Sequence, residues 1–192
     1  MNNDWIVVLL TQTVLFFFPA YIGNLSPVIF SKFRVFKTLF DRPLDGGNYY
    51  GDKRMFGKNK TVGGLIFGSI GGVIGAFLMY LSGYLAIGVE VRFWHFPPWL
   101  LYLLFGLLMG FGAMIGDLVK SFVKRRIGIV EGKSWWIFDQ DDFVVGAWLF
   151  SGILIPYSQS WQMFLVALII TPPLHLFANF VAYLLKLKKV WW

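Results

Sequence analysis

The sequence has no cysteine and only two histidines among its 192 residues. Without cysteine it cannot form disulfides, thiolate-ligated zinc sites or a thiol nucleophile, and two histidines argue against a typical zinc site. Charged residues are also scarce, at 14% of the chain against about 25% in soluble domains. Hydrophobic residues make up 57%, and the mean hydropathy is +0.65. This composition argues against a soluble enzyme, because too little polar surface is available to cover the apolar bulk, and against a disordered chain.

Five apolar stretches approach the length of about 20 residues that crosses the hydrocarbon core of a bilayer. We predict spans over residues 5–29, 62–89, 97–117, 143–155 and 161–187. The runs are continuous rather than alternating, which disfavours a transmembrane β-barrel. The second stretch is rich in glycines at spacings of three and four, which allow close helix packing. The predicted fold is an all-α integral membrane protein with about five transmembrane helices, forming one domain over residues 1–192.

The basic residues are distributed very unevenly between the connections. All but one of the seventeen lie in residues 31–61, in residues 118–142 or in the C-terminal tail, and the exception is Arg92. Five crossings place these three regions on one side of the membrane, and the positive-inside rule makes that side the cytoplasm. We therefore expect the N-terminus outside and the C-terminus inside. Most acidic residues lie in or beside the same two loops, which suggests a polar site; two solvated loops are the simpler alternative.

The first polar loop is rich in glycine and lysine between residues 45 and 64. Glycines let a backbone approach a phosphate closely, and successive N–H groups can form an anion-binding nest. Arg54, Lys58 and Lys60 would neutralise phosphate oxygens. The Thr61 hydroxyl would cap the next helix, whose positive end would face the same anion. The GKNKT run lacks Walker A spacing, so a P-loop is rejected. A basic loop that binds lipid headgroups remains the alternative.

The second polar loop carries most of the candidate metal ligands. If the third span continues as a helix past residue 117, Asp117, Ser121 and Lys124 lie on one face of it. Asp139 and Asp142 are three positions apart, so both can face one point if they open the next helix. Three carboxylates and a hydroxyl beside a basic cluster suit a hard divalent cation such as Mg²⁺, which would bridge to a polyphosphate. Helix capping by the aspartates and topogenic anchoring by the basic cluster are the alternatives.

A weaker group of polar residues lies within the predicted spans. Asn24 precedes Pro27 and either stabilises a broken helix or contacts a substrate. His175 and Asn179 lie one turn apart in the last span. Polar groups at this depth are costly and are usually partnered, so helix–helix hydrogen bonds are the favoured role for them.

Together, the two loops resemble the CDP-diacylglycerol synthase superfamily, a group of membrane-embedded phosphatidate cytidylyltransferases. The signature of that group joins a serine to a Lys-Arg pair and ends in Asp-Arg-x-Asp. Here Ser121, Lys124 and Arg125 match the first part, and residues 139–142 resemble the last part, with Gln140 in place of the arginine. The positions that resemble the family's nucleotide segment are Asp45, Tyr49, Arg54, Phe56, Gly57, Lys58, Lys60, Thr61 and Gly64.

Two departures from the bacterial pattern are similar to the archaeal branch, CDP-archaeol synthase. The stretch between Arg125 and Asp139 is short and has no Pro-Gly-His-Gly-Gly run, and the protein is compact, with about five helices. The YIGNLSP run in the first span is similar to the same branch. The resemblance implies an enzyme that condenses CTP with a polyisoprenyl glycerol phosphate, 2,3-di-O-geranylgeranylglyceryl phosphate, giving CDP-archaeol and pyrophosphate. The expected partners are these two substrates and the membrane, and not a nucleic acid; the oligomeric state stays open.

The resemblance also implies roles for individual residues. Mg²⁺ would be the cofactor, held by Asp117, Asp139 and Asp142. The implied catalytic residues are Asp117, Ser121, Lys124, Arg125, Asp139 and Asp142. The implied substrate-binding residues are Asp45, Arg54, Gly57, Lys58, Lys60, Thr61 and Asn24. For this site to form, Lys60 and Asp139 must share one cavity.

Three other functions compete with this one. A small transporter or channel would line a path at the bilayer midplane with polar residues, but the span centres are almost wholly apolar. Another lipid-phosphate transferase is a second alternative, although Asp45 and Gly46 are not followed by the DGxxAR pattern of CDP-alcohol phosphotransferases. A structural membrane protein whose charges serve topology alone is the third.

Overall fold

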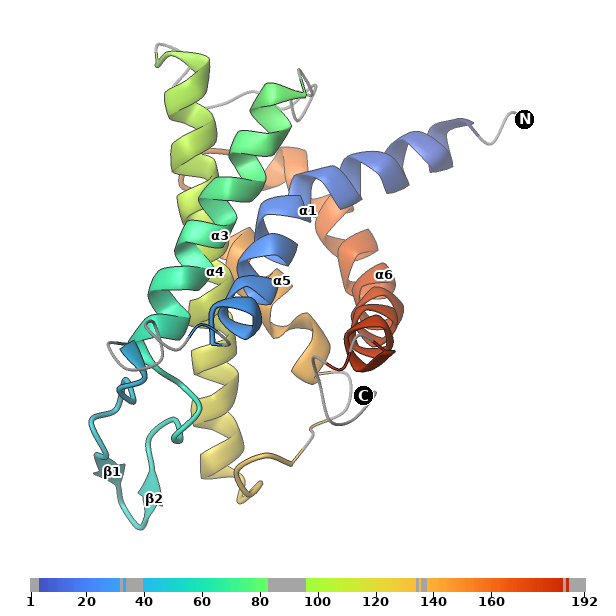
Figure 1. Ribbon diagram of the computed structural model, residues 1–192. Coiled ribbons are helices and arrows are strands. Elements are labelled where there is room, and N and C mark those ends of the chain that lie inside the picture. The colour runs from blue at the N-terminus through green and yellow to red at the C-terminus, as the bar shows by residue number, and fades with distance from the viewer. Residues whose placement is uncertain are drawn as a thin grey trace.

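In the computed structural model, the described residues are 4–31, 33, 40–82, 96–133, 135, 138–184 and 186. They form helices α1 (Asp4–Phe30), α3 (Val62–Leu81), α4 (Pro98–Arg126), α5 (Phe138–Ser151) and α6 (Tyr157–Leu184), together with strands β1 (Tyr49–Tyr50) and β2 (Lys53–Arg54). Within these ranges the structure is helical, as predicted, apart from the antiparallel β1–β2 hairpin, which the expected all-α class did not include (Figure 1). Residues 83–89 of the predicted second span lie outside the described residues, as does Arg92.

Within the described ranges, four helices are long and apolar enough to cross a membrane: α1, α3, α4 and, within α6, residues Ser160–Val181. Helix α5 has 14 residues, which at 1.5 Å per residue is about 21 Å, short of the roughly 30 Å hydrocarbon core. It begins at Phe138, before the predicted span at 143–155, because the aspartates there form its first turn. Helix α4 continues past the predicted end at residue 117 to Arg126. The described chain therefore has the expected number of helices, but α5 does not reach span length.

Close glycine contacts hold the bundle together, as the spacing in the second stretch predicted. Helix α3 packs against α1 and α4, and α5 packs against α4 and α6. A Cβ atom on Gly72 of α3 would lie 2.3 Å from the carbonyl oxygen of Gly106 in α4. A Cβ atom on Gly146 of α5 would lie 2.1 Å from that of Gly112. These backbones touch because neither has a side chain there.

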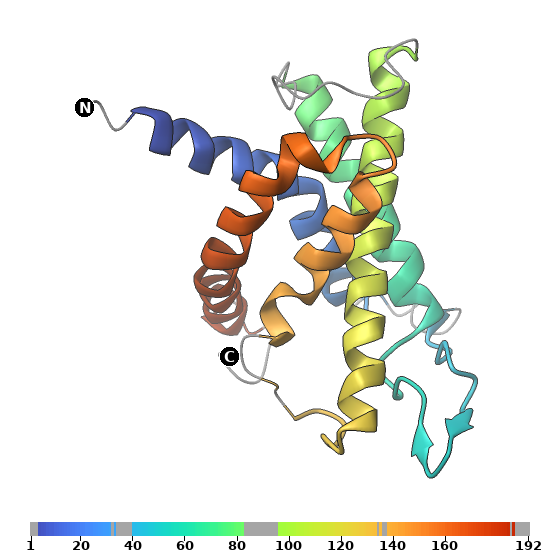
Figure 2. The ribbon, with the colours of Figure 1, turned by 180° about the vertical axis from the view of Figure 1, so that it is seen from behind.

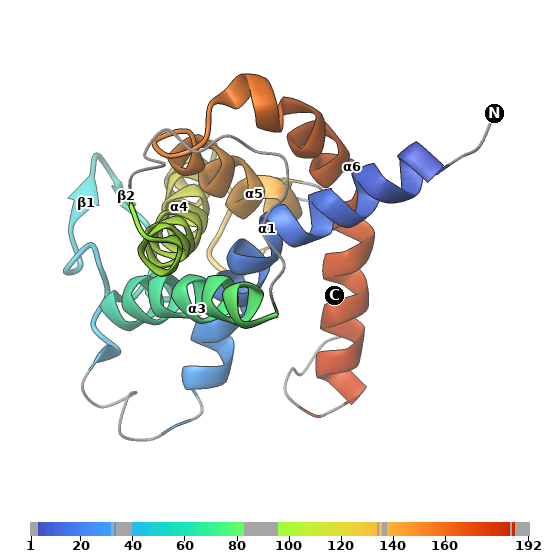
Figure 3. The same ribbon diagram turned by 90° about the horizontal axis from the view of Figure 1, so that it is seen from above.

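The largest buried side chains lie where these helices meet. Phe16 and Phe17 of α1, Met109 of α4, and Phe143 and Val144 of α5 are each less than 2% exposed. Figure 3, a view down the bundle, shows α1, α4 and α5 close together near its centre, with α3 and α6 on either side. The apolar core is therefore formed by elements from both halves of the chain.

The two polar segments lie at the same end of the bundle. The segment between α1 and α3, with its β hairpin, lies beside the C-terminal end of α4 and the turn that follows (Figure 2). The first turn of α5 faces the same end. The start of α1 lies toward the opposite end (Figures 1 and 2). This arrangement places the two charged loops next to each other, as the charge pattern requires.

Candidate active site

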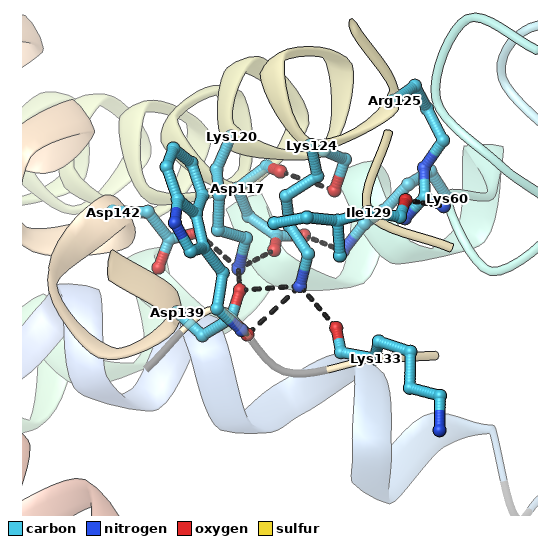
Figure 4. A network of polar contacts seen from close by, with 11 residues as sticks. Lys60, Asp117, Lys120, Lys124, Arg125, Ile129, Lys133, Asp139 and Asp142 are labelled. Carbon is cyan, nitrogen blue, oxygen red and sulfur yellow. Dashed lines mark hydrogen bonds and ion pairs between the residues drawn. The ribbon is translucent and has the colours of Figure 1, made fainter. Parts of the chain in front are cut away.

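A network of ion pairs joins the two polar segments (Figure 4). Lys60, just before α3, contacts the carboxylate of Asp117 in α4. The ammonium of Lys120, one turn further along α4, lies 2.9 Å from Asp117 Oδ1 and 2.8 Å from Asp142 Oδ2. It also lies 3.5 Å from Asp139 Oδ1. The carboxylates of α4 and α5 therefore converge on one ammonium group.

Lys124 extends this network to the loop after α4. Its Nζ lies 2.9 Å from both oxygens of Asp139 and donates a hydrogen bond of 2.6 Å to the carbonyl oxygen of Lys133. The backbone N–H of Trp135 donates to the same carboxylate. Lys124 is only 7% exposed, so this pair is shielded from solvent. The pair aligns the first turn of α5 with the last turns of α4.

A cavity of about 350 Å³ opens beside the network. Each of the five described helices contributes to its wall, and its polar lining residues are Asn24, Asn59, Lys60, Thr61, Asp117, Lys120, Asp139, Asp142 and His175. Lys60 and Asp139 thus share one cavity, as the predicted site requires. The Thr61 hydroxyl accepts a hydrogen bond of 3.1 Å from the Gly64 N–H, which is the predicted helix cap. The cavity thus presents ammonium groups from two segments, Lys60 and Lys120, to which phosphate oxygens could bind, together with the three carboxylates that pair with them.

The loop from residue 42 to 61 is held in shape by an ion pair between Asp45 and Arg54, which does not line the cavity. The Asp45 side chain is fully buried, and the Arg54 guanidinium binds it through Nη2 at 2.8 Å and through Nε. Backbone N–H groups of Gly47, Phe56 and Gly57 donate to the same carboxylate. The hydrogen bonds from Arg54 hold the pKa of the Asp45 carboxyl well below its usual value. This carboxylate therefore shapes the loop from inside.

Two contacts fasten this loop to the end of α4. The Arg126 guanidinium donates to the carbonyl oxygens of Tyr50, Lys53 and Arg54, and lies over the Tyr50 ring, 5.2 Å from its centroid. Further along, the Glu131 carboxylate accepts hydrogen bonds from the backbone N–H groups of Lys58, at 2.6 Å, and Asn59. Two successive N–H groups of the glycine-rich run therefore bind a carboxylate of this chain.

The structure divides the predicted site residues into two groups. Those that line the polar cavity are Asn24, Lys60, Thr61, Asp117, Asp139 and Asp142. Those that do not line it are Asp45, Arg54, Gly57, Lys58, Ser121, Lys124 and Arg125. Lys58 lines a neighbouring cavity of about 490 Å³. Ser121 Oγ donates to the carbonyl oxygen of Asp117 at 2.8 Å, and Arg125 Nη1 to that of Ile129 at 2.7 Å. In this structure both bond to the backbone of α4 or of the turn after it.

Sequence reasoning did not assign Lys120 to the site, and it favoured a helix-packing role for His175. The signal for Lys120 was available, because it lies three residues after Asp117 and hence on the same face of a continuous helix. His175 reaches the cavity from α6, a placement that depends on how α6 packs and that its own span does not reveal.

Oxygen ligands for a hard cation are present, although they do not form a ready-made metal site. Within the described ranges, no group of three or more acidic or histidine side chains is arranged to hold an ion. Asp117, Asp139 and Asp142 instead surround the Lys120 ammonium at hydrogen-bond and ion-pair distances. Oxygen donors of this kind have the chemistry that Mg²⁺ prefers, and in this structure the point on which they converge is occupied by the Lys120 ammonium.

A second, apolar cavity adjoins the same network from the other side of α4 and α5. It measures about 500 Å³, and its walls include Val119 and Val123 of α4 and Leu149 of α5. Lys120 and Asp142 line both this cavity and the polar one. A charged pocket and an apolar one that meet at the same two residues suit an amphiphile with an anionic head.

The fold and the site define a class of protein: a multi-pass membrane protein with a lysine- and aspartate-lined cavity suited to phosphate-bearing substrates. Residues 6–192 match the family model described as CarS-like, CDP-archaeol synthase. The chain therefore belongs to the CDP-archaeol synthase family. It is accordingly a CTP-dependent cytidylyltransferase of archaeal lipid synthesis.

Individual relatives agree with the family model over nearly their whole length. A CDP-archaeol synthase of Methanococcus aeolicus is 36% identical over 97% of this chain and 99% of its own. Those of Methanosarcina barkeri and Methanocaldococcus jannaschii are 36% and 32% identical, over 91% and 96% of this chain and 99% and 98% of their own. A solved structure described as an intramembrane enzyme for archaeal membrane lipids biosynthesis superimposes with a TM-score of 0.67 at 28% identity, covering 88% of this chain and 94% of that one.

Proposed function

We propose that this enzyme joins CTP to 2,3-di-O-geranylgeranylglyceryl phosphate in the polar cavity, releasing CDP-archaeol and pyrophosphate, with Mg²⁺ as cofactor and the cavity on the cytoplasmic side. The observation that carries the proposal is that Lys60 contacts Asp117 beside a cavity that also receives Asp139 and Asp142. The family supplies the reaction class, and the excess of basic residues at this end of the bundle supports the cytoplasmic orientation.

The reaction requires alignment and charge neutralisation more than covalent catalysis. An oxygen of the lipid phosphate attacks the α-phosphorus of CTP, a new P–O bond forms, and the bond from the α-phosphorus to the pyrophosphate oxygen breaks. The attacking phosphate is already ionised, so no protein nucleophile or general base is needed. The task of the protein is to bring two anions that repel each other into line. Lys60 and the N-terminal end of α3 behind Thr61 would hold phosphate oxygens at the cavity wall.

The charge balance of the site supports the proposed metal. Three lysines, Lys60, Lys120 and Lys124, are paired with three aspartates, Asp117, Asp139 and Asp142. The paired groups leave little net charge for a triphosphate and a lipid phosphate that arrive together. Mg²⁺ held by Asp117, Asp139 and Asp142 would supply the missing positive charge next to the departing pyrophosphate.

The lipid substrate would occupy both cavities. Its phosphate would lie in the polar cavity, and its isoprenoid chains would lie along the apolar cavity between α4, α5 and α6. Lys120 and Asp142, which line both, mark the boundary between head and chain. Burial of apolar chain surface contributes roughly 25 cal/mol per Å², which holds the lipid while its phosphate is aligned.

The test is a turnover assay on purified, detergent-solubilised protein. CTP labelled in the α-phosphate is incubated with the lipid phosphate and Mg²⁺. The label is measured in the CDP-lipid, and the unlabelled pyrophosphate is measured separately by an enzyme-coupled assay. We expect equal amounts of both products, and no turnover when Mg²⁺ is chelated. ATP, GTP and UTP in place of CTP test the nucleotide, and an ester-linked phosphatidate tests the lipid. Full activity with the metal removed would refute the cofactor, and no product with CTP and the ether lipid would refute the substrates.

A further inference from the structure

Lys120 occupies the point at which the three site carboxylates converge. Its ammonium is 2.8 Å from Asp142, 2.9 Å from Asp117 and 3.5 Å from Asp139. The side chain is 13% exposed, so solvent contributes little to screening these charges. No other described lysine contacts all three. Lys60 reaches Asp117 alone, and Lys124 reaches Asp139 alone.

These distances fit an ammonium and not a magnesium ion. Mg²⁺ binds oxygen at about 2.0–2.1 Å, whereas the carboxylate oxygens stand 2.8–3.5 Å from the lysine nitrogen. In this arrangement the lysine neutralises carboxylates that would otherwise repel one another in a poorly solvated site. For the carboxylates to close around a smaller divalent ion, the ammonium has to leave the point that it occupies.

Two cavities beside Lys120 leave room for its ammonium group to move. Its side chain lines both the polar cavity of about 350 Å³ and the apolar one. A lysine stem is flexible and has four carbons, so the ammonium can turn into the polar cavity without any movement of α4. In the polar cavity the ammonium would lie beside the phosphate groups of the proposed substrates.

We propose that Lys120 is a resident counter-ion that competes with the divalent metal for Asp117, Asp139 and Asp142 and is displaced into the polar cavity when the metal binds. The inference rests on the proposed metal requirement and adds a consequence to it. Metal alone binds weakly to the resting enzyme, because it has to displace an internal cation that is already paired.

The proposal is tested by metal affinity, without nucleotide and without turnover. Mn²⁺ is titrated into wild-type protein and Lys120→Met, and free Mn²⁺ is followed by electron paramagnetic resonance. Methionine keeps much of the length of the side chain and removes the charge. We expect Lys120→Met to bind Mn²⁺ at least about tenfold more tightly, since one competing charge pair is gone. Lys120→Arg, which keeps the competitor, should bind no more tightly than wild type. Lys133→Met, at an exposed position, is the matched control and should leave the affinity unchanged.

An unchanged or weaker Mn²⁺ affinity in Lys120→Met would overturn the proposal. If that variant does not fold, amine-reactive footprinting of wild-type protein decides instead: labelling of Lys120 should rise severalfold as Mg²⁺ saturates, while labelling of Lys133 stays constant. Constant labelling of Lys120 would overturn it as well. Cytidylyl transfer is scored separately as pyrophosphate release, so failure of the counter-ion model and failure of the proposed reaction give different results.

Discussion

Lys60 and Asp117 are 57 positions apart in the chain, and their side chains are in contact at the wall of the polar cavity. One belongs to the glycine-rich loop before α3 and the other to the middle of α4. Their contact joins the two charged segments into one site. Both residues are therefore suitable targets for substitution.

Lys60→Met should reduce kcat/KM for CTP by about a hundredfold or more, because a preorganised cation at a phosphate site contributes on this order. The measurement is pyrophosphate release across a range of CTP concentrations. Lys133→Met, which removes an exposed charge from the neighbouring loop, should stay within about twofold of wild type. A Lys60→Met enzyme with wild-type kinetics would mean that Lys60 serves only to pair Asp117.

Lys124→Ala and Asp139→Ala should each abolish measurable turnover while the protein still inserts and folds. Lys124 donates to both carboxylate oxygens of Asp139 at 2.9 Å, so each variant leaves a shielded charge without its partner. We therefore expect a lower Tm in each single variant, and a smaller loss in the double variant than the two losses added together. Retained activity in both single variants would remove this pair from the site.

Asp45→Asn should lower the stability of the loop by about 1–3 kcal/mol near neutral pH, since a buried acceptor of charged hydrogen bonds is weakened. The folded-state pKa of Asp45 lies below its unfolded value, which is about 3.9. Its stabilisation is therefore complete above about pH 5 and is lost as the pH falls through 4 toward the folded-state pKa. Hydrogen exchange of residues 45–57 between pH 3 and 7 measures this.

The control for Asp45→Asn is Asp52→Asn, at an exposed position in the β1–β2 turn. It should reproduce the acid dependence of the wild-type loop, whereas Asp45→Asn should flatten it. An Asp45→Asn loop with the same pH profile as wild type would show that the Arg54 contact does not stabilise the folded loop.

Gly116→Ala should destabilise the contact between α4 and α5 and also impair the site. A Cβ atom there would lie 2.1 Å from the carbonyl oxygen of Asp142, so the helices have to separate at the turn that carries the carboxylate. We expect a loss of about 1–3 kcal/mol, seen as a lower Tm in detergent, together with reduced turnover. Gly64→Ala is the matched control for stability, because its Cβ would meet only Thr61 Oγ1, at 3.5 Å. Equal Tm values for the two variants would contradict the packing argument.

Much of the architecture could be read from local patterns. Apolar length located the long helices approximately, the glycine spacing in α3 predicted close helix packing without identifying the partner, and Thr61 was recognisable as a helix cap. The charge bias predicted that the two polar loops would lie at one end. Each of these predictions depends on the residues of a single segment. Bilayer thickness and the need to pair backbone polar groups in lipid then leave few structures that such a segment can adopt.

The partners of the charged side chains in the site were harder to predict from the sequence. Asp45 and Arg54 were assigned to a substrate, yet in this structure they bind each other inside the loop. Arg126 was given no role in the site, yet its guanidinium holds the hairpin by three carbonyl oxygens. A charged residue in a polar loop looks the same in sequence whether it faces a ligand or its own backbone, and only the partner distinguishes the two.

The sequence by itself determined that this chain enters a membrane, roughly where its long apolar helices lie, and which family of enzymes it resembles, because hydropathy and motif spacing are properties of single segments. Only the tertiary structure decided that Lys120 stands among Asp117, Asp139 and Asp142, and that the apolar and polar cavities meet there. Side chains from two helices converge on that point through the close packing of α4 on α5, which depends on crossing geometry that no single stretch of sequence encodes.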